Sequence, residues 1–391
     1  MRLSERQKRL DQLLHRTHDL WHPQPFREIR PAWCAEYPDL LAELLALDDA
    51  TAEALNNDGR AALAFLARYV PLASDLAALS EMPIRQASAK IDHGWRWAWE
   101  IPGRKQQQIE AFAAAAHPAR LPVLDWCAGK GHLGRLLALQ WEVAVTSLEI
   151  DPHLCEAGTQ LAARSQVNQK FACKNALTVT DSFSAGQQAV ALHACGDLHR
   201  RLIQGGVAAG VAQLDIAPCC YYRGVMEVYQ PLSGALQTRV TGDDARLAVT
   251  ETVTASARLT RQRDKEMAWK LGFDLLRRES TGESGYRSFK PVPAAWFRGD
   301  FPTFIALMAQ RENMAVPYRS GLADYESLGW QRQREVMRLS IVRHAFRRPL
   351  EVLLVQDLGL YLEAQGYEVS IGSFCERQLT PRNLLISARR A

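Results

Sequence analysis

Residues 121–151, LPVLDWCAGKGHLGRLLALQWEVAVTSLEID, decide the fold class of this chain. An apolar run ends on Asp125 and a glycine-rich loop follows it. A leucine-rich helix pattern then leads to a second apolar run, which ends on Glu149. Strand, glycine loop, helix and strand with a terminal acid form the opening unit of nucleotide-binding α/β folds. The pattern predicts a cofactor site made by Asp125, Cys127, Gly129, Lys130, Gly131 and Glu149.

The acid before the glycine loop distinguishes between two cofactors. In a dinucleotide site a pyrophosphate lies beside this turn, and the carboxylate of Asp125 would repel it. S-adenosylmethionine has no phosphate and carries an ammonium and a sulfonium group. We therefore expect S-adenosylmethionine, with Asp125 near its methionine end and Glu149 on its ribose, rather than NAD. The plainer alternative is a glycine cluster that binds no ligand.

Composition excludes several classes of protein. The chain of 391 residues is too long for one ordinary core, and 47% hydrophobic with 23% charged residues is typical of a soluble globular protein. We find no apolar run that would span a bilayer and no signal peptide, and we expect a cytoplasmic protein. Eight cysteines without a CxxC pair argue against a disulfide framework and a zinc ribbon, so no metal is predicted.

The pattern of apolar residues divides the chain into four segments. Residues 1–104 predict a helical domain, and residues 105–223 the first part of an α/β core. Residues 224–335 show no strand–helix alternation and predict an insertion, which suits substrate recognition. Residues 336–391 predict two helices and a strand pair. Trp95, Trp97 and Trp99 alternate as on one face of an extended segment, where they could stack bases or, as we favour, pack against the next domain.

Short apolar runs at 171–175, 189–192 and 211–216 predict further strands of a parallel, doubly wound sheet. The runs at 367–374 and 383–388 predict an antiparallel pair that closes it. A Rossmann-like class I methyltransferase sheet requires such a C-terminal hairpin, and NAD folds usually lack it. Asn175 and Ala176 follow a strand at the place where an adenine amino group is commonly bound.

Polar residues follow the other strand ends, which meet at one edge of such a sheet. Methyl transfer from a sulfonium is an in-line displacement that needs a held acceptor atom and, for some acceptors, a base. His193 is the candidate base, or it hydrogen-bonds the loop backbone. Asp197 either orients His193 or caps the following helix, and capping is favoured.

Four cysteines, Cys127, Cys195, Cys219 and Cys220, fall in loops at this same edge. A thiolate could activate a pyrimidine ring, or the thiolates could hold zinc. The favoured interpretation is small side chains that pack beneath the cofactor. Tyr221 and Tyr222 are candidates for stacking on a flat acceptor base.

Four motifs in order resemble one group of class I methyltransferases. They are LDWCAGKGHL at 124–133, LHACGDL at 192–198, CCY at 219–221 and LTPRNL at 379–384. The group is methyltransferase domain 32, which includes eukaryotic proteins named for an rRNA adenine dimethylase domain. The HxCG and CC elements are also similar to the eukaryotic tRNA 2′-O-methyltransferase family, whose N-terminal CHHC finger is absent here. The resemblance covers residues 105–223 and 336–391. It implies a site around His193, Cys195, Cys219, Cys220, Arg382 and Asn383.

Basic residues cluster at 2–16, 258–270 and 332–348, although the net charge is only +4. Such clusters suit a phosphate backbone, or they form solvated helix faces. With the resemblance, they favour methyl transfer to structured RNA, tRNA or rRNA. The alternatives are a protein or small-molecule substrate, a silent S-adenosylmethionine-binding module, and an NAD-dependent oxidoreductase.

Overall fold

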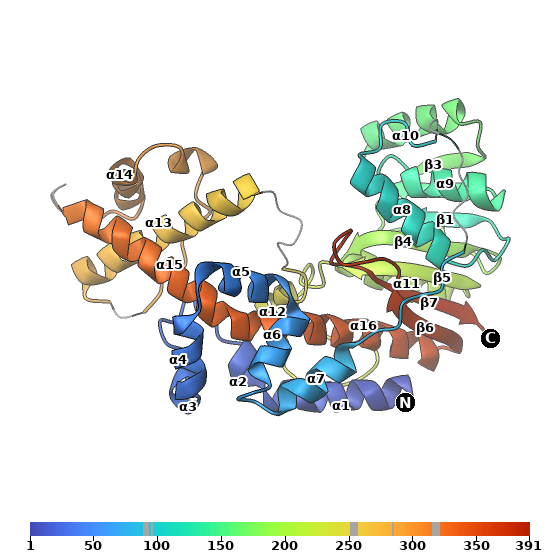
Figure 1. Cartoon of the computed structure of the whole chain (residues 1–391). Helices are drawn as coiled ribbons and strands as arrows, with labels where there is room; N and C mark the ends of the chain where they lie inside the picture. The colour runs from blue at the N-terminus through green and yellow to red at the C-terminus, as the bar shows by residue number, and fades with distance from the viewer. Residues whose placement is uncertain (89–93, 95–96, 251–256, 284, 315–320) are drawn as a thin grey trace. The chain divides into compact units, whose positions relative to one another are not determined.

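The computed structural model describes residues 1–391 except 89–93, 95–96, 251–256, 284 and 315–320 (Figure 1). The chain forms two compact units, which are described separately. The sheet unit contains residues 1–15, 78–251 and 348–391, and the helical unit contains residues 16–77 and 252–347. The predicted helical domain 1–104 and insertion 224–335 are therefore each shared between the two units.

The sheet unit is built on seven strands in the order β3-β2-β1-β4-β5-β7-β6 (Figure 1). Strands β1 to β5 pair in parallel, and β7 pairs antiparallel with both β5 and β6. The predicted methyltransferase-like sheet with its antiparallel C-terminal hairpin is thus confirmed. The strands are β1 (Val123–Trp126), β2 (Val145–Glu149), β3 (Gln169–Cys173), β4 (Gln188–Cys195), β5 (Gln213–Cys219), β6 (Tyr367–Ser373) and β7 (Leu384–Arg390).

Helices connect and cover these strands. The core beside β1 joins the apolar face of α8 to that of α9, and it includes Ile109, Phe112, Leu136 and Leu137. Burial of such side chains is the main stabilising contribution, about 1.5–3 kcal/mol each. The helices of this unit are α1 (Leu3–Arg16), α8 (Gly103–Ala115), α9 (His132–Trp141), α10 (Pro152–Arg164), α11 (Asp197–Ala208), α12 (Gly242–Leu247) and α16 (Arg347–Ala364).

The helical unit is organised around α15 (Leu322–Ala345), which packs against α13 (Ala257–Thr281), α5 (Asp49–Asn57) and α6 (Gly59–Leu66). The buried Asn56 fixes one of these contacts, because its Nδ2 donates to the carbonyl of Met337 at 2.8 Å. An aromatic cluster that includes Trp269, Phe301 and Phe304 forms a second core. The remaining elements are α2 (His18–Trp21), α3 (Trp33–Glu36), α4 (Pro38–Ala46), α7 (Leu72–Ser80, which continues into the sheet unit), η1 (Ala294–Phe297) and α14 (Phe301–Arg311).

The predicted alternation of tryptophans on an extended segment is wrong for Trp97 and Trp99. Residues 97–100 form a turn rather than an extended segment, so their side chains do not alternate. Trp97 is buried in the core of the sheet unit, whereas Trp99 is half exposed. Trp95 lies outside the described residues. The packing interpretation therefore holds for Trp97, whose carbonyl also accepts two hydrogen bonds from the buried Arg135.

Candidate active site

The loop between β1 and α9 turns through three residues in the left-handed backbone region. Cys127, Gly129 and Gly131 have φ of 57°, 57° and 65°. A Cβ atom at Gly129 would meet no atom within 4 Å, so this side of the loop is open. A Cβ at Gly131 would instead meet the Gln169 amide and the Phe171 ring. The loop therefore offers backbone to a ligand at Gly129 and packs tightly on β3 at Gly131.

Glu149, the last residue of β2, points at this loop. Its Oε2 accepts from the Gly129 backbone N–H at 2.8 Å, and its Oε1 accepts from Ile150 and Asp151 at 2.9 and 3.1 Å. A carboxylate has about four acceptor positions, so three backbone donors leave room for a ribose hydroxyl. The three bonds fix the orientation of the carboxylate before any ligand arrives. We call Gly129, Gly131 and Glu149 the cofactor half of the site.

Asp125 lies beneath the loop, not on its surface. The side chain is 2% exposed, and its Oδ2 accepts from the Gly134 N–H at 3.0 Å and from the Ser147 hydroxyl at 3.1 Å. Burial raises the pKa of Asp125 to about 6, against the effect of these hydrogen bonds. This burial argues against the predicted place at the methionine end of a cofactor, because Oδ2 holds α9 against β2.

The other predicted cofactor residues lie around the same strand ends. Asn175 is exposed just beyond β3, where its Oδ1 accepts from the Leu177 N–H at 2.9 Å, and Ala176 beside it is buried. Lys130 forms an ion pair with Glu100 at 3.3 Å. Burial raises the pKa of Cys127 to about 12, so this side chain is a neutral thiol.

The ends of β4 and β5 form the second half of the site. The two strands pair in register except for a bulge between Leu192 and Ala194, and His193 occupies this bulge with φ of 68°. Cys220, just beyond β5, has φ of 47°. Such values are rare for residues other than glycine, and strained residues concentrate at functional sites. We call His193, Cys195, Cys219 and Cys220 the acceptor half.

His193 is a neutral imidazole in this environment. Burial lowers its pKa to about 3, and the charges of Lys105 and Arg382 act in the same direction. Its Nδ1 is buried and has no hydrogen-bond partner in the described part of the chain. An efficient general base needs a pKa near the working pH, so the predicted role as a base does not fit. The ring instead belongs to the bulged end of β4 as a neutral side chain, with its Nδ1 enclosed by the protein.

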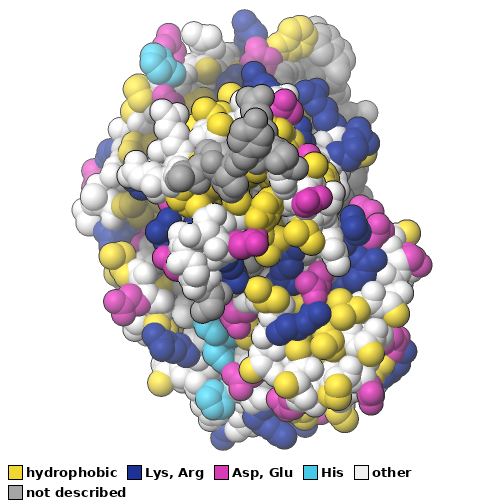
Figure 2. Space-filling model, turned by 90° about the vertical axis from the view of Figure 1, so that its left-hand side faces the viewer, with side chains coloured by type: hydrophobic (Ala, Val, Ile, Leu, Met, Phe, Trp, Pro, Cys, Tyr) yellow, Lys and Arg dark blue, Asp and Glu magenta, His cyan; other side chains and the backbone are white. Residues whose placement is uncertain are grey.

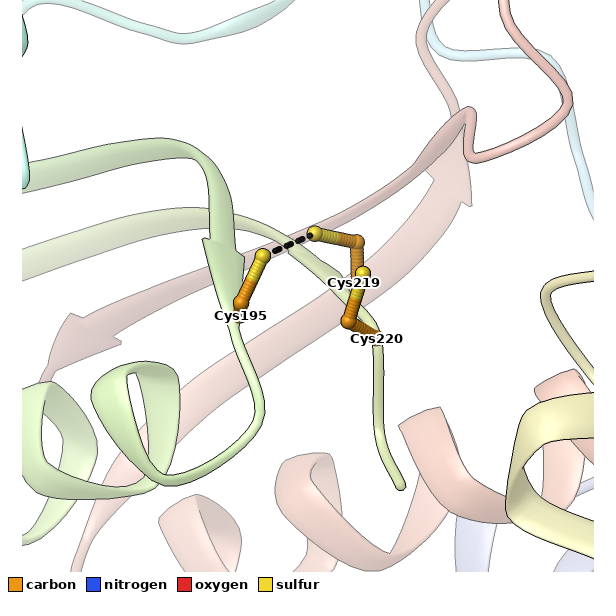
Figure 3. A group of neighbouring side chains, drawn as sticks. All are labelled: Cys195, Cys219 and Cys220. Atoms are coloured by element: carbon orange, nitrogen blue, oxygen red, sulfur yellow. Dashed lines mark hydrogen bonds between the residues drawn. The ribbon is translucent and has the colours of Figure 1, made fainter. Parts of the chain in front are cut away.

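The three cysteines of the acceptor half lie together (Figure 3). The Sγ atoms of Cys195 and Cys219 are 3.4 Å apart, and all three Sγ atoms lie within 4.8 Å of one another. The thiols of Cys195 and Cys219 lower the pKa of Cys220, and the charges of Arg382 and Arg223 add to this effect. Hydrogen bonds with Cys195 and Cys220 raise the pKa of Cys219. Cys220 is thus the favoured position for a thiolate.

Several predicted residues have structural roles. Tyr221 is 1% exposed and packs edge-on against His199, so it cannot stack on an acceptor base. Tyr222 is half-buried, and the Cζ of Arg246 lies 4.6 Å from the centre of the Tyr222 ring. Asp197 begins α11 in its first turn, where it pairs with Arg200 at 3.9 Å, and Gly196 occupies the N-cap. The alternative that Asp197 orients His193 finds no supporting contact among the described residues.

Arg382 and Asn383 lie between β6 and β7. Asn383 is 3% exposed, donates to the Cys375 carbonyl at 2.6 Å and accepts from Arg348 at 3.1 Å, so a role in binding substrate is not supported. Arg382 donates to the Val249 carbonyl at 3.2 Å, and its charge acts on both His193 and Cys220. Arg382 therefore remains part of the electrostatic surroundings of the acceptor half.

Sequence reasoning missed Lys105, in the first turn of α8. Burial lowers the pKa of this lysine, while the charges of Asp125 and Cys219 oppose the change. It also acts electrostatically on His193, so it links the two halves of the site. A single lysine that follows a Pro-Gly step carries no motif, and only the packing of α8 beside β1 brings it here.

Comparison with known proteins identifies one domain. Residues 104–225 match a family model described as a methyltransferase domain (Methyltransf_32). A glutathione S-transferase C-terminal domain-containing protein of Xenopus laevis is 31% identical over 123 residues, which are 30% of this chain and 19% of the relative. The chain thus matches about a fifth of that relative's length.

Solved structures with similar segments include two methyltransferases. The 23S rRNA methyltransferase ErmE is 21% identical over 29% of this chain and 45% of its own, with a TM-score of 0.24. The glycopeptide N-methyltransferase MtfA, complexed with S-adenosylmethionine, is 17% identical over 30% of this chain and 55% of its own, with a TM-score of 0.25. Similarities at these TM-scores support no substrate or mechanism for this chain.

The family match and the sheet order agree on one part of the chain. Residues 104–225 are a methyltransferase domain, and the cofactor of such a domain is S-adenosylmethionine. Among the described residues, no helix is both long enough and apolar enough to cross a bilayer.

Proposed function

We propose that this chain transfers a methyl group from S-adenosylmethionine to structured RNA. The observation that carries the methyl-transfer part is the glycine loop closed by Glu149 within a methyltransferase domain. Glu149 is held by three backbone donors in an orientation suited to a ribose diol. The open side of Gly129 leaves space for the cofactor to approach the backbone. Asn175 and Ala176, beyond the neighbouring strand β3, would border its adenine.

S-adenosylmethionine supplies an electrophilic methyl group, so the protein has to hold the acceptor atom in line with it. The acceptor half is the proposed place for this atom. His193, in the bulge at the end of β4, would border this atom as a neutral side chain. Because the pKa of His193 is lowered to about 3, the ring stays neutral at physiological pH, so the proton that the acceptor loses on methylation would pass to water rather than to His193.

Exposed arginines support RNA as the substrate. Arg258, Arg261 and Arg263 in the first two turns of α13 are exposed, and no acidic partner is found for them among the described residues. Three basic side chains so close together suit a phosphate backbone. They are the part of the predicted basic clusters that best fits this role.

Several arginines of the basic cluster at 332–348 are instead used inside the helical unit. Arg332 pairs with Glu335 at 2.6 Å, Arg338 pairs with Asp49 at 2.9 Å, and the buried Arg347 donates to the Asn56 carbonyl at 2.7 Å. Figure 2 shows Lys and Arg side chains mixed with acidic and apolar ones over one face of the molecule, without a continuous basic surface. The phosphate-binding proposal therefore concerns the start of α13.

Transfer of labelled methyl from S-adenosylmethionine to total cellular RNA and, in parallel, to total protein tests the proposal. We expect label in RNA with the wild type and none with Glu149→Ala. Glu156→Ala, an exposed acid on α10, is the matched control and should label like the wild type. Label in protein alone would replace RNA with a protein acceptor. Cofactor binding without label in either would favour a small-molecule acceptor or a silent binding module.

The salt dependence of RNA binding tests the arginines separately. In an Arg258→Ala, Arg261→Ala, Arg263→Ala variant, the slope of log affinity against log salt should fall by about one for each phosphate that is no longer bound. Arg338→Ala is the control, because Arg338 is engaged with Asp49 and the Leu47 carbonyl. An unchanged slope in the triple variant would remove α13 from the RNA interface while leaving the methyl-transfer proposal intact.

A further inference from the structure

The three thiols of the acceptor half converge although they are far from a finger-like spacing in the sequence. Cys195 and Cys219 are paired residues of the parallel strands β4 and β5. Side chains at paired positions of neighbouring strands point to the same face of a sheet. Strand register thus brings their Sγ atoms to 3.4 Å, as a CxxC turn would do in a zinc ribbon (Figure 3).

Backbone strain brings in the third thiol. Successive residues of a strand point to opposite faces, so an extended Cys220 would point away from Cys219. Cys220 instead has φ of 47°, and its Sγ lies in the same group as the other two, within 4.8 Å. A left-handed conformation costs a residue with a Cβ roughly 1–2 kcal/mol. Simple packing would not require this, because glycine or asparagine would adopt the turn more easily.

We propose that Cys195, Cys219 and Cys220 bind a thiophilic divalent metal ion, zinc above all, with the fourth coordination position left open. Zinc–thiolate bonds of about 2.3 Å place the sulfurs of a tetrahedral site about 3.8 Å apart, close to the spacing seen here. Three thiolates and Zn²⁺ carry a net charge of −1, which the neighbouring Arg223 and Arg382 complement. Cys195 and Cys220 are only half-buried, so an ion can reach the group. This site does not depend on the proposed RNA substrate.

Metal binding by the full chain tests the site directly. The protein purified under reducing conditions without chelator should contain one zinc ion per chain by mass spectrometry. After its removal, Co²⁺ should bind with thiolate-to-cobalt charge-transfer absorption, and Zn²⁺ should displace it. Cys195→Ser and Cys220→Ser should each weaken Co²⁺ binding by more than the roughly 10- to 100-fold that removal of a metal ligand's hydrogen-bond partner costs. The matched control is Cys173→Ser, at an exposed thiol that interacts with Cys155 alone among the cysteines.

Cysteine protection in the wild type gives an answer even if a variant fails to fold. Zn²⁺ should slow alkylation of Cys195, Cys219 and Cys220, read for each peptide by mass spectrometry, and should leave Cys173 unchanged. Equal alkylation with and without Zn²⁺ would overturn the proposal. The same conclusion follows if Cys173→Ser weakens Co²⁺ binding as much as Cys220→Ser does.

Discussion

The two halves of the site bend the backbone in the same way but with different residues. In the cofactor half, Gly129 and Gly131 take the left-handed conformation at little cost, and only Cys127 among the loop's turning residues carries a side chain. In the acceptor half, His193 and Cys220 take it with side chains that can titrate or bind a ligand. In the proposed cofactor half, flexible glycines expose the backbone beside one anchored carboxylate, whereas in the acceptor half strain positions the side chains themselves. Changes in the two halves should therefore fail in different ways.

The largest effect is expected at Gly131. Comparison with Gly129 separates loss of cofactor binding from loss of stability. Gly131→Arg would drive a side chain into Gln169 and Phe171 and should lower the free energy of unfolding by about 3 kcal/mol. Gly129→Arg faces open space and should cost only the backbone strain, roughly 1–2 kcal/mol. Both should lose S-adenosylmethionine binding. Urea unfolding and calorimetric titration measure the two quantities, and equal stability of the two variants would contradict the packing described for Gly131.

A smaller effect is expected from Glu149→Gln, which keeps the shape of the cofactor half but not its charge. The amide would turn an NH₂ group toward one of the backbone donors that now bind Glu149. Loss of a charged hydrogen bond of about 1.5–3 kcal/mol corresponds to roughly 10- to 100-fold weaker cofactor binding. Calorimetric titration measures the cofactor affinity of this variant, with Glu156→Gln as the control. Cofactor affinity within about threefold of the wild type would show that Glu149 acts on the loop alone.

The cofactor half could be predicted from sequence because its signals are local. Apolar runs, glycines and a terminal acid follow one another within residues 121–151, and the hairpin at the C-terminus was visible in the same way. The burial of Asp125 could not be predicted from the sequence, because a residue at a strand end can face either the ligand or the neighbouring helix. Its burial against Gly134 depends on how closely α9 packs, which no local pattern records.

The sequence predicted which residues gather in the acceptor half. It did not predict which of their side chains are buried or which lie close together. Tyr221 follows an expected strand and Asn383 begins one, and both are nevertheless buried. Side-chain direction alternates along a strand, and a bulge or turn reverses it. The approach of Cys220 to Cys195 depends on strand register and one left-handed residue. The helical unit combines residues 16–77 with 252–347, so its boundaries could not be read from neighbouring sequence.

Per pH unit, the smallest effect is a pH dependence that should come from His193 in the acceptor half and from the neighbouring His199. Burial lowers the pKa of His193 to about 3 and that of the fully buried His199, in the first turn of α11, to about 4. Their pKa values in the folded state lie below the unfolded value of about 6.5, so their contribution to stability is complete above that pH. It is lost as the pH falls from about 6.5 toward 4, by up to about 1.4 kcal/mol per pH unit for His199.

Asp125, which lies beneath the cofactor half, should act in the opposite direction over part of this range. The pKa of Asp125 is raised to about 6, so the folded state takes up a proton that the unfolded state does not hold until lower pH. Its contribution to stability is therefore present at low pH and is lost as the pH rises through about 6. Asp125→Asn should steepen the acid loss of stability, whereas His199→Asn should flatten it.

His199→Asn is the sharper of these two variants. An asparagine amide can still donate to the Ala194 carbonyl, which His199 Nδ1 contacts at 3.1 Å, but it does not titrate. Urea unfolding at several pH values between 5 and 7.5 measures the slope, and His153→Asn at an exposed position of α10 is the control. Stability at pH 7.5 should fall because the smaller side chain leaves space beside Tyr221, while the slope below pH 6.5 decreases. An unchanged slope would mean that His199 does not contribute to the acid sensitivity, and the expected loss of stability would then rest on His193 alone.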